Sequence, residues 1–103
     1  MNRVLLHAQI VERGPLRYTP AGLPALDLRL VHASQVTQAN SPRQVSFEMH
    51  ATAIGELVRT IEALAVGTTA DFEGFLAKQR NGRGVMLHIT GFVPHDTSID
   101  RSN

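Results

Sequence analysis

The sequence predicts an all-β domain that contains one short helix. Five segments alternate apolar and polar residues with the period of two expected of strands buried on one face: 3–11, 25–34, 44–53, 68–77 and 85–93. After the third segment the apolar spacing becomes that of one helix face, with Ile54, Leu57, Val58, Ile61 and Leu64. The length of 103 residues suits a single domain with one modest core.

Turn-forming residues separate these segments. Gly14-Pro15 ends the first strand, and the stretch 19–24 has the proline and glycine content of a turn. Residues 34–42 contain a proline and few apolar residues, so we predict a mobile loop there. Asn81-Gly82 favours a hairpin turn between the last two strands. Residues 95–103 are expected to form a flexible C-terminal tail.

Single residues refine the last two strands. Gly74 interrupts the fourth strand, which predicts a bulge or a sharp bend. Phe75 and Phe92 have the opposite parity to the apolar positions around them, so we expect both to face outward.

The order of the elements predicts a closed barrel. Three strands in a meander, a helix that covers one end and a final hairpin are arranged as in the OB-fold, a five-stranded Greek-key barrel. Residues 1–94 would form this domain, with the short helix between its third and fourth strands. A different small β-barrel with a helix on one face is the alternative.

Composition limits the possible functions. The chain has no cysteine, which excludes a disulfide scaffold, a thiolate zinc site and a cysteine nucleophile and fits a reducing cytoplasm. No apolar run approaches the roughly 20 residues of a membrane helix. The five histidines lie in different segments, and His7, His50 and His88 have the parity of surface or rim residues. Without an HExxH, Walker A or GxSxG motif, we expect no enzyme, no cofactor and no metal site, and a metal site built from histidines that folding brings together is the alternative.

Positive charge is concentrated locally although the net charge is only +1. The stretch KQRNGRG, residues 78–84, carries three of the ten basic residues and no acid. A nucleic-acid interface must therefore depend on where these charges lie, not on the total charge.

Five fragments between positions 2 and 93 resemble the bacterial single-stranded-DNA-binding protein family, and within it the shorter PriB branch (primosomal replication protein N). They are NRVLLHAQIV, PLRYTPAGLPALDLRLVHAS, RQVSFEM, VGTTADFEGFLA and NGRGVMLHITGF. The ordinary members have tryptophans along the DNA path and a long tail that ends in an acidic, aromatic peptide. This chain has no tryptophan and stops at DTSIDRSN, which favours the shorter branch.

The resemblance implies an OB-fold homodimer in the cytoplasm that binds single-stranded DNA. It also implies work with the PriA helicase and other primosome proteins in the restart of stalled replication forks, toward reloading of the replicative helicase. A protein-interaction adaptor with the same fold and little affinity for nucleic acid is the alternative function.

Candidate DNA-binding residues lie in the two loops that border the groove of an OB-fold. Lys78, Arg80 and Arg83 in the last hairpin could follow a phosphate backbone, or could serve only solubility. Arg17 and Tyr18 follow the first strand. Arg17 could bind a phosphate or be merely solvated, and Tyr18 could stack on a base or cap the end of the core.

Three further candidates lie on the central strands. Arg29 is on the polar face of the second strand, and Arg43 enters the third strand from the predicted loop. The spacing of Phe47 with Val45 and Met49 favours the core, and a base-stacking platform is the alternative. With so few aromatic residues, binding should depend mainly on phosphate contacts and therefore on salt.

Overall fold

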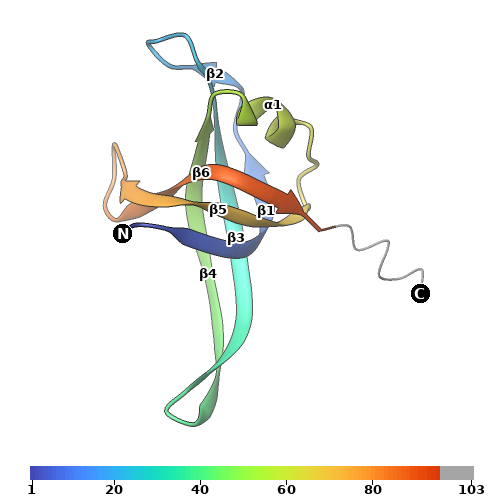
Figure 1. The fold of residues 1–103 in the computed structure, drawn as a ribbon, viewed down its shortest axis with the longest axis vertical. Coiled ribbons are helices and arrows are strands. Elements are labelled where there is room, and N and C mark those ends of the chain that lie inside the picture. Colours follow the sequence, from blue (N-terminus) through green and yellow to red (C-terminus); the bar gives the residue numbers. More distant parts are fainter. Residues whose placement is uncertain (96–103) are drawn as a thin grey trace, which may run out of the picture.

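The computed structural model describes residues 1–95 as a sheet that closes into a barrel, with one helix at its end (Figure 1). The predicted tail, 95–103, lies outside the described residues except for His95. The elements are β1 (Val4–Arg13), β2 (Arg17–Tyr18), β3 (Pro24–Gln38), β4 (Ser41–Ile54), α1 (Leu57–Glu62), β5 (Thr69–Lys78) and β6 (Val85–Pro94). Within residues 1–95, no helix has the length and apolar character needed to cross a membrane.

The barrel closes because β1 pairs with two strands. The order in the sheet is β1-β5-β6-β4-β3-β2, and an additional pairing joins β1 to β3. The first part of β1 pairs with β5, and its last part pairs with β3. The register shifts between Ile10 and Glu12, so Val11 is an extra residue that lets β1 bend from one partner to the other. The predicted five-stranded barrel is confirmed, and β2 is a two-residue addition beside the start of β3.

The core follows the predicted alternation. Leu26, Leu28 and Leu30 of β3 are buried, and Val58 and Ile61 of α1 are fully buried where the helix covers the barrel end. The other members of the core are Ala8, Ile10, Ala51, Ala53, Ala70, Phe72, Leu87 and Ile89. Burial of these apolar side chains is the main source of stability for a domain without disulfides.

The predicted mobile loop at residues 34–42 is wrong. Strands β3 and β4 continue through this region and pair residue by residue as far as Gln38 and Ser41. Ala39 and Asn40 form the two-residue turn, and their φ angles of 52° and 63° are those of a type I′ hairpin turn. We call residues 34–45 the arm, because this hairpin projects away from the barrel (Figure 1). The arm has no buried face, which explains its polar sequence.

The predicted irregularity at Gly74 is confirmed. Glu73 is opposite Gly91 and Gly74 is opposite Ile89, so Thr90 is an extra residue in β6. The extra residue reverses the parity of the rest of β6. Phe92 is therefore partly buried and stacks on Phe72, with ring centroids 6.2 Å apart, and the predicted outward orientation of Phe92 is wrong.

The last hairpin is wider than a tight Asn-Gly turn. Strands β5 and β6 pair as far as Lys78 and Val85, and the Gln79 amide donates to the Gly84 carbonyl oxygen at 3.1 Å. Gly84 has a φ of 84°, whereas Gly82 does not adopt a positive φ. The hairpin is where the sequence predicts it, but residues 79–84 form a loop.

Gly74 is the position at which the barrel should be least tolerant of a side chain. A Cβ atom there would lie 1.9 Å from the carbonyl oxygen of His88, which belongs to the backbone and cannot rotate away. We expect Gly74→Ala to lower the free energy of unfolding by at least about 2 kcal/mol, measured by urea denaturation.

Gly91→Ala is the matched control for this prediction. Gly91 lies beside the same bulge, and its added Cβ would meet nothing within 4 Å. Equal stability of the two variants would contradict the close approach of β5 and β6 at Gly74.

Candidate nucleic-acid interface

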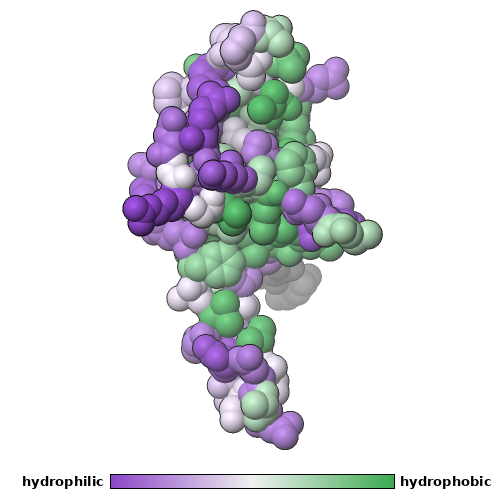
Figure 2. All heavy atoms as spheres, turned by 90° about the vertical axis from the view of Figure 1, so that its left-hand side faces the viewer, coloured by the Kyte–Doolittle hydropathy of each residue, from purple (hydrophilic) through white to green (hydrophobic). Residues whose placement is uncertain are grey.

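A groove of about 720 Å³ crosses one side of the barrel. One wall is formed by β2 and β3, the floor by β4, and the other wall by β6 and the β5–β6 loop. That loop is on the left in Figure 1, so its side faces the viewer in Figure 2. Figure 2 shows strongly hydrophilic side chains next to an apolar area on this face, with the arm below.

The groove brings together three of the predicted residues. Arg17 comes from β2, and Lys78 and Arg80 come from the end of β5 and the loop that follows. Arg83 is in the same loop but does not line the groove. Arg29 lines a smaller neighbouring hollow that shares Asp27, Leu28 and His50 with the groove.

Tyr18 does not cap the core. Its side chain is 65% exposed next to Arg17, and it lines neither hollow. Of the two orientations that the sequence left open, the structure therefore shows the exposed one.

Phe47 and Arg43 belong to the arm and its base, outside the groove. Phe47 is 39% exposed, so the predicted core position is wrong. The parity is as predicted, but at this point β4 has already left the barrel. Phe47 instead packs near His32, with ring centroids 5.1 Å apart. Arg43 donates to the Gln38 Oε1 atom at 2.7 Å, across the arm.

Arg17 is held by an acid inside the groove. Its Nε and Nη2 atoms donate to the two carboxylate oxygens of Asp27, each at 2.9 Å. Hydrogen bonding from Arg17 lowers the pKa of Asp27 below its ordinary value, although partial burial opposes the shift. The nearby positive charge of Arg80 lowers this pKa further. The carboxylate is thus charged at neutral pH and neutralises part of the groove.

Arg29 is also paired with acids. Its Nη2 atom lies 3.0 Å from a Glu12 carboxylate oxygen, and its Nη1 atom lies 3.7 Å from Glu48. By contrast, no ion pair of Lys78, Arg80 or Arg83 occurs within residues 1–95. The end of β5 and the β5–β6 loop therefore supply cations that no neighbouring acid neutralises.

The sequence identifies two flat side chains of the groove only as surface or rim residues. His50 lines the groove from β4 and His88 lines it from β6. The His88 ring stacks on Phe75, with centroids 4.9 Å apart and planes 9° apart, and Phe75 is exposed as predicted. The polar parity of His50 and His88 is visible in the sequence. The parallel pairing that makes β4 and β6 neighbours is not.

Comparisons with known proteins agree on one family. Residues 2–91 match the model of a family described as another single-strand binding protein family. Replication restart protein PriB of Bordetella pertussis is 43% identical over 90 residues, which are 86% of this chain and 84% of that protein. The chain belongs to the PriB family of single-strand binding proteins. The predicted family resemblance is thereby confirmed.

Solved structures of this family and of its relatives share the fold. PriB from Ralstonia solanacearum has a TM-score of 0.84 at 38% identity, covering 93% of this chain and 99% of that one. The single-stranded DNA binding protein from Thermus aquaticus has a TM-score of 0.74 at 25% identity, covering 93% of this chain and 50% of that one. The closed barrel with its short helix is therefore the OB-fold that the sequence predicts.

The Arg17–Asp27 ion pair should be detectable in a pH titration of Asp27. We expect Arg17→Ala to move the pKa of Asp27 upward, toward or above the ordinary value of 3.8, because its main hydrogen-bond donor is lost. The carboxyl carbon shift of Asp27, followed by NMR against pH, measures this change.

The same pair makes stability depend on pH. The pKa of Asp27 is lower in the folded protein than in the unfolded chain. The stability that the ion pair contributes is therefore fully present above the pKa of Asp27 in the unfolded chain, and it is lost as pH falls through the pKa of Asp27 in the folded protein. The stability difference between wild type and Arg17→Ala should shrink toward acid pH. Arg59→Ala removes an exposed charge from α1 and should leave the pKa of Asp27 unchanged.

Proposed function

We propose that this chain binds single-stranded DNA as an accessory protein of replication restart. The observation that carries the proposal is the location of Lys78 and Arg80, two cations without an acidic partner among residues 1–95, on one wall of the groove of a PriB-family barrel. Single strands are held by basic grooves that follow the backbone and by flat side chains on which bases stack. Residues 1–94 form the binding domain in this proposal.

The phosphates lie along the β5–β6 loop. Lys78 and Arg80 contact them from the groove wall, and Arg83 extends the positive track from the same loop. Arg17 joins when a phosphate competes with Asp27 for its guanidinium group. Arg29, already shared between Glu12 and Glu48, contributes mainly to orienting the wall.

The bases meet only a few flat surfaces. Tyr18 is an exposed aromatic ring at one end of the groove wall, and the His88–Phe75 stack offers another surface. Phe47 and Arg43 provide a second contact region at the arm if the strand runs past the barrel. Each stacked base contributes roughly 1–3 kcal/mol, so phosphate contacts dominate and binding is strongly salt-dependent.

The relatives' names support the biological setting. Proteins with which this chain shares 43% and 34% identity are named replication restart protein PriB. We infer a non-enzymatic, cytoplasmic homodimer that links the PriA helicase to DNA and helps reload the replicative helicase with other primosome proteins. The competing function is that of an adaptor that binds only proteins. Substitution of Lys78 and Arg80 distinguishes the two functions.

The free cations of the loop should control affinity. We expect Lys78→Ala combined with Arg80→Ala to weaken binding to a labelled poly-dT strand by about tenfold or more at low salt. The slope of log K against log salt should become shallower by about 1.4, since each lost phosphate contact of a single strand contributes about 0.7. Fluorescence anisotropy at several salt concentrations measures both quantities, with a duplex of the same length as the comparison ligand.

Arg3→Ala combined with Arg59→Ala is the control, because it removes the same charge from exposed positions that do not line the groove. If the loop variant binds the strand as tightly as this control, the loop does not hold DNA and the adaptor function is favoured.

Removing the acid of the groove should have the opposite effect. Asp27→Asn frees Arg17 and removes a negative charge beside Arg80, so we expect severalfold tighter binding of the same strand and a steeper salt slope. Glu62→Gln changes the net charge equally on the exposed side of α1 and should alter affinity little. Equal affinities of the two variants would place the strand away from Arg17.

A further inference from the structure

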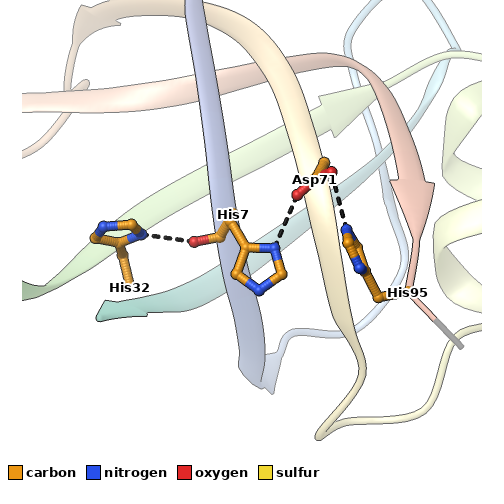
Figure 3. A network of polar contacts seen from close by, with 4 residues as sticks. All are labelled: His7, His32, Asp71 and His95. Atoms are coloured by element: carbon orange, nitrogen blue, oxygen red, sulfur yellow. Dashed lines mark hydrogen bonds and ion pairs between the residues drawn. The ribbon is translucent and has the colours of Figure 1, made fainter. Parts of the chain in front are cut away.

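A second polar cluster lies away from the groove, on the outer surface of β1, β5 and the residue after β6. His7, Asp71 and His95 form this cluster (Figure 3). The His7 Nδ1 atom lies 2.8 Å from Asp71 Oδ1, and the His95 Nε2 atom lies 2.9 Å from Asp71 Oδ2. Figure 3 shows the two rings approaching the carboxylate from opposite sides. None of the three residues lines the groove, so the cluster is independent of the proposed DNA contacts.

The backbone fixes all three positions. His7 and Asp71 are direct partners in the β1–β5 ladder. The β5–β6 ladder ends with Ala70 opposite Pro94, and the His95 amide then donates to the Thr69 carbonyl oxygen at 2.8 Å. His95 is thereby held beside the same strand that carries Asp71.

His32 positions the strand that carries His7. Its Nδ1 atom lies 2.6 Å from the His7 carbonyl oxygen, and because a carbonyl only accepts, Nδ1 donates (Figure 3). The Nε2 atom contacts the Ser34 hydroxyl at 2.9 Å. The β1–β3 ladder ends at Gln9 and Val31, so His32 adds a side-chain link beyond its last pair.

We propose that His7, Asp71 and His95 bind a divalent zinc ion. Two imidazole nitrogens and one carboxylate, with water in the fourth position, are a ligand set that suits zinc. The three ligating atoms lie within 4.8 Å of one another. Two nitrogens on one tetrahedral zinc lie about 3.3 Å apart, given zinc–nitrogen bonds of about 2.0–2.1 Å. The side chains are about half exposed, so the rings have room to rotate toward this distance.

Electrostatics prepares the site for a cation. The Asp71 carboxylate lies between the two imidazole rings and within hydrogen-bond distance of both, so its negative charge attracts a cation to this point. Because a carboxylate oxygen only accepts, each ring presents an N–H group to Asp71 when no metal is bound. Zinc would bind the lone pair of the same nitrogen, so each neutral ring must then carry its proton on its other nitrogen.

The consequence of zinc binding is a cross-link between β1, β5 and the end of β6. A ligand that binds only the folded state stabilises it in proportion to the logarithm of its concentration. Zinc should therefore raise the melting temperature of the wild-type chain.

Isothermal titration of zinc chloride into untagged protein at neutral pH tests the proposal, without DNA. We expect one ion per chain in wild type, and a dissociation constant at least about 100-fold higher in His7→Ala and in His95→Ala, since even loss of an outer-shell partner costs 10–100-fold. Asp71→Asn should weaken binding as well. His88→Ala removes a histidine elsewhere on the barrel and should leave zinc affinity unchanged.

Thermal unfolding in the presence of zinc gives a second readout. The zinc-dependent increase in melting temperature should disappear in His95→Ala, whose exposed side chain can be removed with little effect on folding. Absence of saturable binding to wild type, or undiminished binding by His7→Ala and His95→Ala, would overturn the proposal.

Discussion

The structure depends on the way in which β1 divides its backbone hydrogen bonds between β5 and β3. One extra residue, Val11, lets the strand turn from one partner to the other, and the sheet closes at this point. On the opposite side of the barrel, β4 and β6 pair in parallel through two residue pairs, and this pairing completes the ring of strands. Closure brings the β5–β6 loop across from β2 and β3, which are far from it in sequence. The groove is therefore a product of the barrel's pairing and not of any one segment.

Ion pairing distinguishes the arginines of β2 and β3 from the basic residues at the end of β5 and in the β5–β6 loop. Arginines on β2 and β3 have acids as neighbours, because adjacent strands place Asp27, Glu12 and Glu48 within reach of their guanidinium groups. The β5–β6 loop extends beyond the last strand pair, and its sequence contains no acid. Because no acid among residues 1–95 pairs with them, Lys78 at the end of the ladder and the arginines of the loop keep their charge available, which gives a local preference for anions without a high net charge.

The sequence was sufficient where one strand face meets the core. The alternation of Leu26, Leu28 and Leu30 predicted a buried face, and the apolar helical spacing after residue 54 predicted α1. The arm could not be predicted from periodicity, because neither of its faces is buried. Phe92 was misplaced because the extra residue Thr90 becomes evident only when β6 is paired with β5.

The candidate site was predictable only in part, for a similar reason. The basic loop is contiguous in sequence and therefore visible as a motif. The Arg17–Asp27 pair, and the position of His50 and His88 in the groove, depend on which strands become neighbours. The same is true of His7, Asp71 and His95, which come from three separate segments and form no spacing pattern. Pairwise geometry carries this information, and single-sequence patterns do not.

Gly74 has a bearing on how substitutions among related chains are interpreted. The main chains of β5 and β6 approach so closely at this residue that a methyl group would overlap the His88 carbonyl oxygen. An unchanging glycine at this column of a family alignment would therefore reflect backbone geometry and would say nothing about ligand recognition. In the neighbouring β5–β6 loop, a Cβ atom added at Gly84 would meet nothing within 4 Å, and only the positive φ restricts this residue. Sequence variation in this loop is therefore the better indicator of functional divergence.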